Sequence, residues 1–475
     1  MAQRSSRMAR RFNSRNEAPG KDSRERSDRW KETPPKGFLP RVTRRDFLKT
    51  LPVAVAGAAG FPAIVKAATL GREGAVPPSD KIVMAGIGFG MQGIPNMRAF
   101  LQKDEVRWVA VCDLDKEHLK QAQGIVNQHY GNESCATYHD FRELYARGDL
   151  DAVSIAVPDH WHAILSISAA RAGLDIFGEK PFSHSLAEGR AMCDAVKRYG
   201  RVWQTGSWQR SVDNFHRASE LVRNGRIGKI LRVEVGLPAG HYDFARTFGQ
   251  WAVGPPPREL DYDFWVGPAP FVPYCKARVH MNWRWNMDFG GGQLMDWIGH
   301  HLDIAHWGLG FDYAGPIEVQ GRGEFPTTGI YNSATRYWVD AKYADGTPFV
   351  LAGGYDEIQS GTKWIGEYGW IWVDRGGFET QPAYLVNEII GPGEIKLIKS
   401  RDHCQNFVDS VKSRALTIAP AEVAHRSASV GHLGVIAIET GRRIKWDPAT
   451  ETISGDAEAN RLLSRAYRGP WQLPA

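Results

Sequence analysis

The sequence predicts an α/β domain with a parallel sheet, followed by an α+β domain with a large, mostly antiparallel sheet. Between residues 81 and 205, apolar runs with strand character take turns with runs of helical spacing, which indicates strands joined by crossover helices. After residue 205, short runs alternate between apolar and polar side chains, and Gly, Pro and Asp separate them, as in half-buried strands. We therefore place the two domains at 80–204 and 205–475, behind a leader at 1–67.

The leader has the pattern of an export signal. Residues 43–49 read Thr-Arg-Arg-Asp-Phe-Leu-Lys, a twin-arginine motif, and a modest apolar run follows at 51–61. Residues 65–67, Val-Lys-Ala, offer a small-residue cleavage site. The apolar run is too short and too rich in Gly and Ala for a stable membrane anchor. We expect the twin-arginine machinery to export the protein to the periplasm; a disordered basic arm before a buried helix is the alternative.

Charge and cysteine usage narrow the classes of function. Residues 1–50 hold 15 Lys and Arg against 6 Asp and Glu, whereas the whole chain holds 59 against 53, so the basic charge belongs to the leader. This distribution argues against nucleic acid as a partner. The cysteines have neither metal-ligand nor redox spacing, and a protein that folds in the reducing cytoplasm before export should keep free thiols. We expect all five to be packing residues: Cys112, Cys135, Cys193, Cys275 and Cys404.

The first predicted strand, 81–87, runs into a glycine-rich turn. The next six residues match G-x-G-x-x-G: Gly88, Phe89, Gly90, Met91, Gln92 and Gly93. The glycines permit a tight turn and close backbone approach, and the helix that follows directs free N–H groups at a pyrophosphate. A second strand, 106–112, ends at Asp113, 20 residues after Gly93, where a ribose-binding acid belongs. The pattern predicts a dinucleotide-binding Rossmann domain rather than a turn that only packs a helix on a strand.

Asp113 favours NAD over NADP as the cofactor. Its carboxylate should accept hydrogen bonds from the adenosine ribose diol, and its charge would repel a 2′-phosphate. Lys116 is close enough in sequence to leave NADP as the second choice. Because free NAD is scarce outside the cytoplasm, an exported protein should carry its cofactor with it and re-use it in place.

Two later strands end in polar motifs. The strand at 151–157 is followed by Pro158, and the strand at 175–178 runs into Glu179, Lys180 and Pro181. Ligands of parallel sheets bind at the carboxyl ends of the strands, so we place Pro158, His162, Glu179 and Lys180 beside the cofactor. His160 and His162 can contact nicotinamide or substrate, or they can cap the predicted helix at 163–172.

Four motifs together resemble the Gfo/Idh/MocA family of oxidoreductases, which includes glucose-fructose oxidoreductase and inositol dehydrogenase. The motifs are the glycine fingerprint, PDHWH at 158–162, EKP at 179–181 and GGGQLMDWIGHHLD at 290–303. The resemblance covers about 80–475 and includes the secreted, twin-arginine members, to whose C-terminal region 283–285 and 373–377 are similar. It implies a nicotinamide-dependent oxidoreductase that forms dimers or tetramers through its antiparallel sheet.

Hydride removal from a secondary alcohol needs a base for the hydroxyl proton and a cation that stabilises the developing alkoxide. Lys180 ends a strand beside the expected nicotinamide and can hydrogen-bond the hydroxyl. Asp296 and His300 are four residues apart, so on a helix the carboxylate can orient the imidazole. In the family the matching Lys is catalytic, and the matching His is an acid/base that the Asp assists. We predict these three as catalytic; a surface lysine and a polar helix stripe are the alternatives.

The catalytic segment departs from the family in one position and contains several histidines. The family often has Gly two residues before its His, whereas Gly299 directly precedes His300 here. Asp296, His300, His301 and His306 lie close enough in sequence to raise the question of zinc. No Cys joins them, and the H-E-x-x-H pattern is absent, so we expect no metal.

The second domain has features of a sugar pocket. The chain contains 17 Trp residues, and a group of them precedes the predicted catalytic helix: Trp203, Trp208, Trp251, Trp265, Trp283 and Trp285. Aromatic faces stack well on sugar rings, and as a set they favour a carbohydrate over a small acid, although most single Trp residues simply pack in cores. The candidate substrate contacts are Trp161, Arg210, Trp283, Arg284 and Asp303.

Three functions remain in competition at this point. The first is an NAD-dependent oxidoreductase acting on a secondary hydroxyl of a sugar, with a tightly bound, recycled cofactor. The second is a glycoside-cleaving enzyme similar to NAD-dependent glycosidases, in which transient ring oxidation, elimination and hydride return give no net redox change. The third is a non-catalytic sugar-binding protein on a dehydrogenase scaffold, against which the presence of Lys180, Asp296 and His300 argues.

Overall fold

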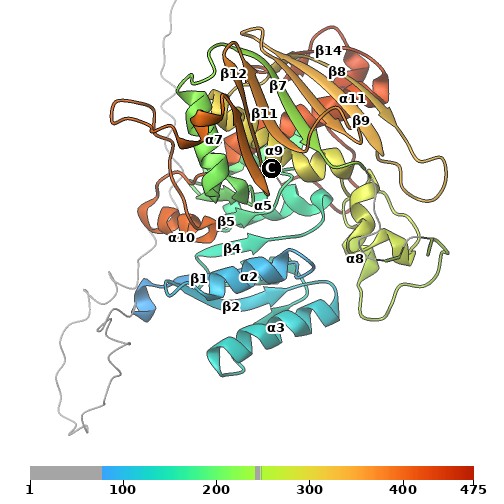
Figure 1. Ribbon diagram of the computed structural model, residues 1–475. Coiled ribbons are helices and arrows are strands. Elements are labelled where there is room, and N and C mark those ends of the chain that lie inside the picture. Colours follow the sequence, from blue (N-terminus) through green and yellow to red (C-terminus); the bar gives the residue numbers. More distant parts are fainter. Residues whose placement is uncertain (1–76, 241–245, 248, 475) are drawn as a thin grey trace, which may run out of the picture. The chain divides into compact units, whose positions relative to one another are not determined.

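Two sheets organise the described part of the chain (Figure 1). The structure is a computed structural model in which residues 77–240, 246–247 and 249–474 are described. The leader predicted at 1–67, with its twin-arginine motif, lies outside the described residues. Among the helices that are described, none is long and apolar enough to cross a membrane.

The first sheet has six parallel strands in the order β3-β2-β1-β4-β5-β6. Its strands are β1 (Ile82–Ile87), β2 (Val106–Cys112), β3 (Ala136–Tyr138), β4 (Ala152–Ile155), β5 (Asp175–Gly178) and β6 (Trp203–Thr205). The helices between them are α2 (Gly93–Leu101), α3 (Lys116–Tyr130), α4 (Phe141–Tyr145), α5 (His162–Arg171) and α6 (Leu186–Arg198). The strand order reverses between β1 and β4, and this switch point is where such sheets bind ligands. The predicted Rossmann domain is confirmed.

Helices cover both faces of this sheet because its strands are apolar on both sides. Met84 and Trp108 pack with α2 and α3, whereas Ala85 and Ala110 belong to the core shared with α5 and α6. Strands buried on both faces form continuous apolar runs, as parallel strands commonly do. The bounds of these strands and helices lie within a few residues of those predicted from the sequence, because the apolar runs mark the strands clearly.

The second sheet has nine strands in the order β13-β12-β11-β7-β10-β9-β8-β14-β15. The strands are β7 (Ile230–Leu237), β8 (Pro316–Glu324), β9 (Arg336–Tyr343), β10 (Pro348–Gly353), β11 (Gly361–Gly366), β12 (Gly369–Asp374), β13 (Gly377–Gln381), β14 (Ile444–Asp447) and β15 (Thr452–Ile453). Only the β7–β10 pair is parallel, and the other pairs run antiparallel. The predicted large, mostly antiparallel sheet is confirmed.

Helices α7 (Asp213–Arg223), α9 (Gly292–Leu309) and α11 (Ala421–Thr440) contact the second sheet. Along β10, Phe349 and Leu351 face the core shared with these helices, and the alternate residues Val350 and Ala352 face away from it. The hydroxyl of Thr362 donates to the carbonyl of His301 at 2.6 Å, and the Trp364 indole donates to that of Ala305 at 3.2 Å. These contacts fix α9, which carries the predicted catalytic motif, on the sheet.

Helix α10 (His403–Ser413) packs on the first domain, although the sequence boundary assigns it to the second. The Phe407 ring lies 5.9 Å from Phe100 and 5.8 Å from Phe177, centroid to centroid. The chain thus returns to the first domain after forming most of the second. A single domain boundary in the sequence cannot describe this arrangement. Two short helices, α8 (Tyr262–Val266) and α12 (Ala457–Arg461), lie in the same part of the sequence as the second domain. All five cysteines are buried and form no disulfide.

An arm formed by residues 255–280, which include α8, reaches the first domain. The sequence predicts a long wrapping loop at 255–273, and α8 interrupts it. Lys116 donates its backbone N–H to the Glu259 carbonyl at 3.0 Å, and Asp261 donates to Leu114 at 3.1 Å. The arm is therefore fastened beside the end of β2, at the carboxyl edge of the parallel sheet.

Candidate active site

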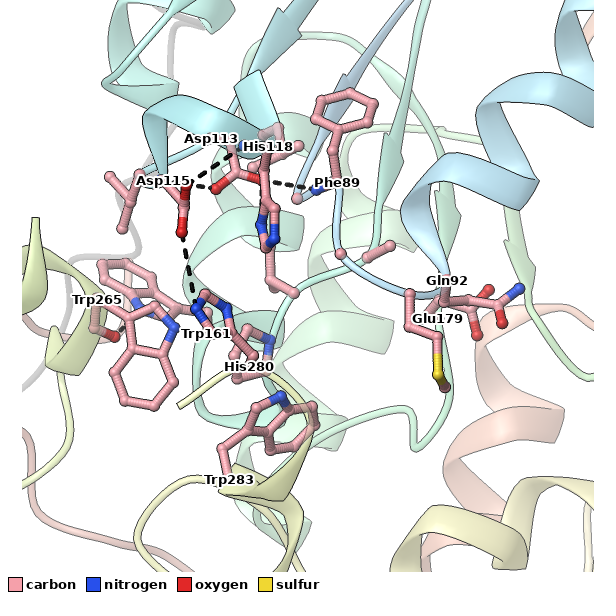
Figure 2. Close-up of a pocket in the computed structure, with 18 of the residues that line it drawn as sticks. Phe89, Gln92, Asp113, Asp115, His118, Trp161, Glu179, Trp265, His280 and Trp283 are labelled. Carbon is pink, nitrogen blue, oxygen red and sulfur yellow. Dashed lines mark hydrogen bonds and ion pairs between the residues drawn. The ribbon is translucent and has the colours of Figure 1, made fainter. Parts of the chain in front are cut away.

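A cavity of about 740 Å³ lies along the carboxyl ends of β1, β2, β4 and β5. The glycine-rich turn and the arm around α8 form its walls, and Lys180 and Asp296 line it as well. Figure 2 shows the part of the cavity nearest to the turn, with Asp113 and His280 among the residues that line it. Apart from Gly93 and His162, the residues that the sequence assigns to the cofactor all line this one cavity.

The three glycines of the turn have different steric roles. Gly88 has φ of 83°, and a Cβ there would lie 2.3 Å from the Ala156 carbonyl oxygen. A Cβ at Gly93 would lie 1.9 Å from the carbonyl oxygen of Gly88, so only glycine allows the turn and the helix to meet. A Cβ at Gly90 would meet no protein atom within 4 Å. The space above Gly90 therefore fits a group that approaches the backbone closely, as a pyrophosphate does.

Asp113 lies at the end of β2 and holds the turn in place. One carboxylate oxygen accepts the N–H of Phe89 at 2.7 Å, and the other accepts that of Asp115 at 2.9 Å (Figure 2). Burial raises the pKa of Asp113, although these hydrogen bonds oppose the effect. The carboxylate retains lone pairs for a ribose diol, since each oxygen can accept more than one hydrogen bond.

Sequence reasoning missed one group at this end of the cavity. Asp115, His118 and His280 bring their ligand atoms within 4.8 Å of one another, a spacing that could hold a metal ion. Asp115 also caps α3 by accepting the N–H groups of Glu117 and His118, and His280 approaches it at 3.7 Å. Because His280 comes from the arm, the group links the arm to α3. Residues more than 160 positions apart give no local signal of this contact.

Glu179 lies beneath the turn rather than at an open surface. Its carboxylate accepts a hydrogen bond from the Asn96 amide at 2.8 Å, and Asn96 accepts one from Gln92 at 2.9 Å. Burial raises the pKa of Glu179. Glu179, Pro158 and Gln92 all line the cavity, so this network supports the turn from the side of β5.

Lys180 and Arg284 share the carboxylate of Asp296. The Lys180 Nζ lies 2.9 Å from Asp296 Oδ1 and also donates to the Asp296 carbonyl at 2.7 Å. The Arg284 Nε donates to the same Oδ1 at 3.0 Å. Burial alone would raise the pKa of Asp296, but the two cations outweigh it and hold the pKa well below its usual range. An ammonium fixed in this way at the end of a cofactor cavity can hydrogen-bond a substrate hydroxyl.

His300 lies one helical turn after Asp296 but is not part of this cluster. In the described structure no hydrogen bond joins the His300 ring to the Asp296 carboxylate, and its Nδ1 is buried without a partner. The ring packs against Trp208 and Trp297, with centroids 6.2 and 5.6 Å away. Burial, reinforced by the charge of Lys180, lowers the pKa of His300 well below its usual value, so the imidazole is neutral. The expectation that Asp296 orients His300 is therefore replaced by the pairing of Asp296 with Lys180 and Arg284.

The glycine that departs from the family pattern has a packing role. A Cβ at Gly299 would lie 3.1 Å from the Cβ of Lys180, a tight contact. Glycine at this position therefore lets α9 approach Lys180 closely. Asp296 and His300 lie on adjacent turns of this helix.

Two predicted contacts near the cofactor serve the fold instead. Both ring nitrogens of His162 lie within hydrogen-bond distance of carbonyl oxygens, those of Pro181 at 2.8 Å and Val157 at 3.0 Å, and the ring does not line the cavity. Trp161 lines the cavity, but its indole N–H donates to the carbonyl of Trp265 at 3.0 Å (Figure 2). His162 therefore joins two strand ends, and Trp161 is a wall of the cavity.

Two predicted substrate contacts form a buried ion pair. Arg210 donates to both carboxylate oxygens of Asp303, at 2.6 and 3.0 Å, and to Asp312 at 2.6 Å. Arg210 and Asp303 are each 2% exposed, and neither lines the cavity. The guanidinium and the carboxylate satisfy each other, so we correct their assignment from substrate binding to the support of α9. Trp283 and Arg284 do line the cavity, and the Arg284 guanidinium lies 4.4 Å from the Trp283 ring centroid.

The other histidines of α9 contact different parts of the second sheet. His301 Nδ1 lies 2.8 Å from the Gly236 carbonyl oxygen and its Nε2 lies 3.3 Å from Asp374, whereas His306 contacts the hydroxyl of Tyr343. Together with Asp296, these side chains point to separate partners. We find no common point at which the predicted group of α9 side chains would bind zinc.

The known proteins similar to this chain include glycosidases and sugar oxidoreductases. The "Glycosyl hydrolase family 109 protein 1" of Shewanella sp. strain MR-4 is 28% identical over 211 residues, 41% of this chain and 45% of that protein. The chain thus aligns with less than half the length of this relative. An aldose-aldose oxidoreductase from Caulobacter crescentus, complexed with glycerol, has a TM-score of 0.57 at 20% identity, covering 77% of this chain and 99% of that one. The WlbA dehydrogenase from Bordetella pertussis, in complex with NADH and UDP-GlcNAcA, also has a TM-score of 0.57, at 17% identity, covering 77% and 99%.

At identities of 17–20%, likeness to a solved structure shows only the fold. Matches to family models also show the family. The model described as "Oxidoreductase family, NAD-binding Rossmann fold" matches residues 81–207. The model described as "Oxidoreductase family, C-terminal alpha/beta domain" matches 213–473, more than half of the chain. Both matches agree with the cavity at the switch point of the parallel sheet and with the cluster around Lys180. The chain belongs to the Gfo/Idh/MocA family of oxidoreductases and is an NAD-binding enzyme of that family.

Proposed function

We propose that the enzyme oxidises a secondary hydroxyl of a sugar or sugar derivative and keeps its NAD between turnovers. The observation that carries this proposal is the position of Lys180, whose ammonium is fixed by Asp296 at the end of the cofactor cavity. The names of similar proteins, an aldose-aldose oxidoreductase and a dehydrogenase bound to a nucleotide sugar, support a sugar as the substrate class.

The cluster around Lys180 supplies the polar part of the reaction. A bound nicotinamide would supply the hydride acceptor for the carbon that bears the hydroxyl. The Lys180 ammonium donates a hydrogen bond to the hydroxyl oxygen and stabilises the negative charge that develops there as the proton leaves. Asp296 keeps this ammonium in place, and Arg284 holds the carboxylate by donating to the same Oδ1. The neutral His300 beside this cluster is the candidate proton acceptor, since a charged imidazole could not take up the proton.

The arm around α8 supports the proposal that the cofactor is retained. The arm is joined to the end of β2 by backbone hydrogen bonds and by the contact between His280 and Asp115. These contacts border the cavity at the end where Asp113 would hold the ribose. A closed arm slows dissociation of the dinucleotide, which suits an enzyme that we propose to be exported, folded and loaded, by the twin-arginine pathway. A second sugar carbonyl or another acceptor would then restore the NAD.

A second candidate is cleavage of a glycoside through transient oxidation of the ring. The family 109 glycosyl hydrolases favour it by name, although the alignment covers 45% of the first of them. Such a cycle returns the hydride to the product and needs no external acceptor. The same Lys180 ammonium would serve, because the first step is again oxidation of a ring hydroxyl.

The deciding experiment is mass spectrometry of the protein purified from the periplasm and denatured. We expect one dinucleotide, NAD, released per chain. The loaded protein is then incubated with free sugars and with chromogenic glycosides, without added NAD. NADH that accumulates with a free sugar, or disproportionation of two sugars, supports the oxidoreductase, whereas release of the chromophore supports the glycosidase. A protein that neither carries NAD nor reacts with sugars after NAD is added would contradict both.

A further inference from the structure

An arginine outside the cavity lies beside the predicted catalytic histidine. Arg375 is in the turn between β12 and β13, and its guanidinium carbon lies 4.7 Å from the ring centroid of Trp208 and 4.4 Å from that of Trp297. Trp297 directly follows Asp296 on α9, and Trp208 follows β6. The turn from the second sheet thus reaches the carboxyl edge of the first.

Arg375 and His300 contact the same two indole rings. The His300 ring centroid is 6.2 Å from that of Trp208 and 5.6 Å from that of Trp297. The charge of Arg375 is close enough to contribute to the lowered pKa of His300. Trp208 is 38% exposed, so this surface is open to a ligand. The charge of Lys180 also lowers the pKa of His300, so Lys180 and Arg375 both lie near this imidazole.

The backbone fixes the position of Arg375. Its N–H donates to the carboxylate of Asp374 at 2.7 Å, and Asp374 also accepts from the hydroxyl of Ser360 at 3.0 Å. The other contact of Asp374 is His301 Nε2 at 3.3 Å, on α9. Burial lowers the pKa of Arg375 and the charge of Asp374 opposes this effect, but the Asp374 carboxylate is hydrogen-bonded to its own neighbours and not to the guanidinium.

The N–H groups of the guanidinium are free to bind a ligand. Within the described structure, no carboxylate or carbonyl accepts a hydrogen bond from the Arg375 side chain. The guanidinium carbon lies over both rings, and the N–H donors of a guanidinium lie in its plane. Nearby, Lys180 and Arg284 form ion pairs with Asp296, whereas the described structure gives the Arg375 guanidinium no ion pair within 4 Å.

We propose that the substrate carries a carboxylate, as in a uronic acid or its glycoside, and that Arg375 binds this carboxylate. The proposal rests on the proposed function, since it names the substrate class of that site. A guanidinium edge matches a planar carboxylate through two parallel hydrogen bonds, and a guanidinium held by two rings is pre-organised for it. A neutral sugar would leave this charge unused, and a lysine could not reproduce the fork.

The chain offers a matched control for this arginine. Arg322 on β8 also lies over two aromatic rings, 4.7 Å from the centroid of Trp338 and 5.7 Å from that of Tyr355. It lies on the exposed surface of the second sheet and contacts neither His300 nor the cavity. An effect of Arg375→Met that Arg322→Met does not reproduce would belong to the position and not to the loss of a stacked cation.

The test compares sugars that differ in one charge. NAD-loaded wild type, Arg375→Met, Arg375→Lys and Arg322→Met are titrated calorimetrically with D-glucuronate, D-galacturonate and D-mannuronate, with their methyl esters and with the neutral hexoses. We expect wild type to bind one uronate about tenfold or more tightly than its ester. Arg375→Met should remove this preference without changing ester binding, Arg375→Lys should restore part of it, and Arg322→Met should retain it. Melting temperatures verify that each variant is folded.

The outcomes separate this inference from the proposed function. If wild type reduces its bound NAD with a neutral sugar and binds uronates no better than their esters, the uronate proposal is wrong and the oxidoreductase stands. If uronates bind through Arg375 but no sugar of either kind is oxidised or cleaved, the anion site stands and the proposed function fails. If the preference for uronate persists in Arg375→Met, another residue binds the carboxylate and the assignment is overturned.

Discussion

The two ends of the active-site region are built in different ways. At the cofactor end, a turn of six residues and one acid meet through backbone N–H groups, and all of them come from one strand–helix–strand unit. At the reacting end, charged side chains come from the end of β5, from the segment before α9, from α9 itself and from the turn after β12. The first end depends on backbone geometry and the second on pairing between side chains. Substitutions at the two ends should therefore affect different properties of the enzyme.

The largest effect is expected at the reacting end. Lys180→Met removes the ammonium that polarises the hydroxyl and leaves Asp296 paired with Arg284. We expect kcat to fall by about 10²- to 10⁴-fold, with NAD still present in the purified protein. Lys445→Met, a substitution of an exposed lysine on β14, is the control and should leave kcat unchanged. Near-normal turnover in Lys180→Met would remove Lys180 from the reaction.

A different result is expected where the backbone approaches the cofactor. At Gly90 an added methyl meets no protein atom, but it occupies the space that fits the pyrophosphate. Gly90→Ala should therefore retain its melting temperature and bind NAD about tenfold more weakly, because a methyl forced into filled space costs about 1–3 kcal/mol. Gly124→Ala on α3, where a Cβ also meets nothing within 4 Å, is the control with unchanged affinity. Equal NAD affinities for the two variants would contradict the assignment of the turn.

Asp113 tests which dinucleotide the cofactor end selects. Asp113→Asn keeps one acceptor oxygen but replaces the other by an amide that cannot accept the second backbone N–H. We expect affinity for NAD to fall by about tenfold and affinity for NADP to fall less, since the charge that repels the 2′-phosphate is gone. Fluorescence titration of the stripped protein with both dinucleotides measures the ratio. Glu117→Gln, in the first turn of α3, should leave the ratio unchanged, and an unaltered ratio in Asp113→Asn would show that another residue selects NAD.

The sequence was a better guide to the cofactor end than to the reacting end. The glycine spacing and the acid 20 residues later predict local geometry, because each part is joined to the next by a single strand or helix. The spacing of Asp296 and His300 correctly predicts one helix, but not that the carboxylate turns toward Lys180 and Arg284. Arg375 lies within the segment 373–377 that the sequence singled out, yet its place beside His300 depends on how the second sheet packs on α9. Such contacts depend on tertiary packing, and no local pattern encodes them.

The same reasoning applies to Arg210 and Asp303. Both are polar, and both lie near predicted catalytic motifs, so the sequence suggests substrate contacts. In the structure they satisfy each other within the core beneath α9. A charge in a motif segment binds substrate only where its neighbours leave it unpaired, and only the fold determines which neighbours it has. Arg375 meets this condition in the described structure, and Arg210 does not.

A buried acid between the two ends should make the stability of the fold depend on pH. Burial raises the pKa of Asp159 to about 8, although the charge of Arg284 opposes the effect. In the unfolded chain this carboxyl has a pKa of about 3.9, so between pH 4 and pH 8 the folded state holds a proton that the unfolded state has lost. Asp159 should therefore lower the free energy of unfolding as the pH rises through this window, by at most about 1.4 kcal/mol per pH unit.

Asp159→Asn places a neutral amide where the neutral acid lies. We expect its free energy of unfolding, measured with denaturant from pH 5 to pH 8, to decline less with pH than that of wild type. Asp104→Asn, a substitution of an exposed acid before β2, should follow the wild-type curve. Parallel curves for wild type and Asp159→Asn would show that the acid is ionised in the folded protein. The reacting end would then hold two carboxylates for Lys180 and Arg284, which would weaken the case that Arg375 attracts an anionic substrate.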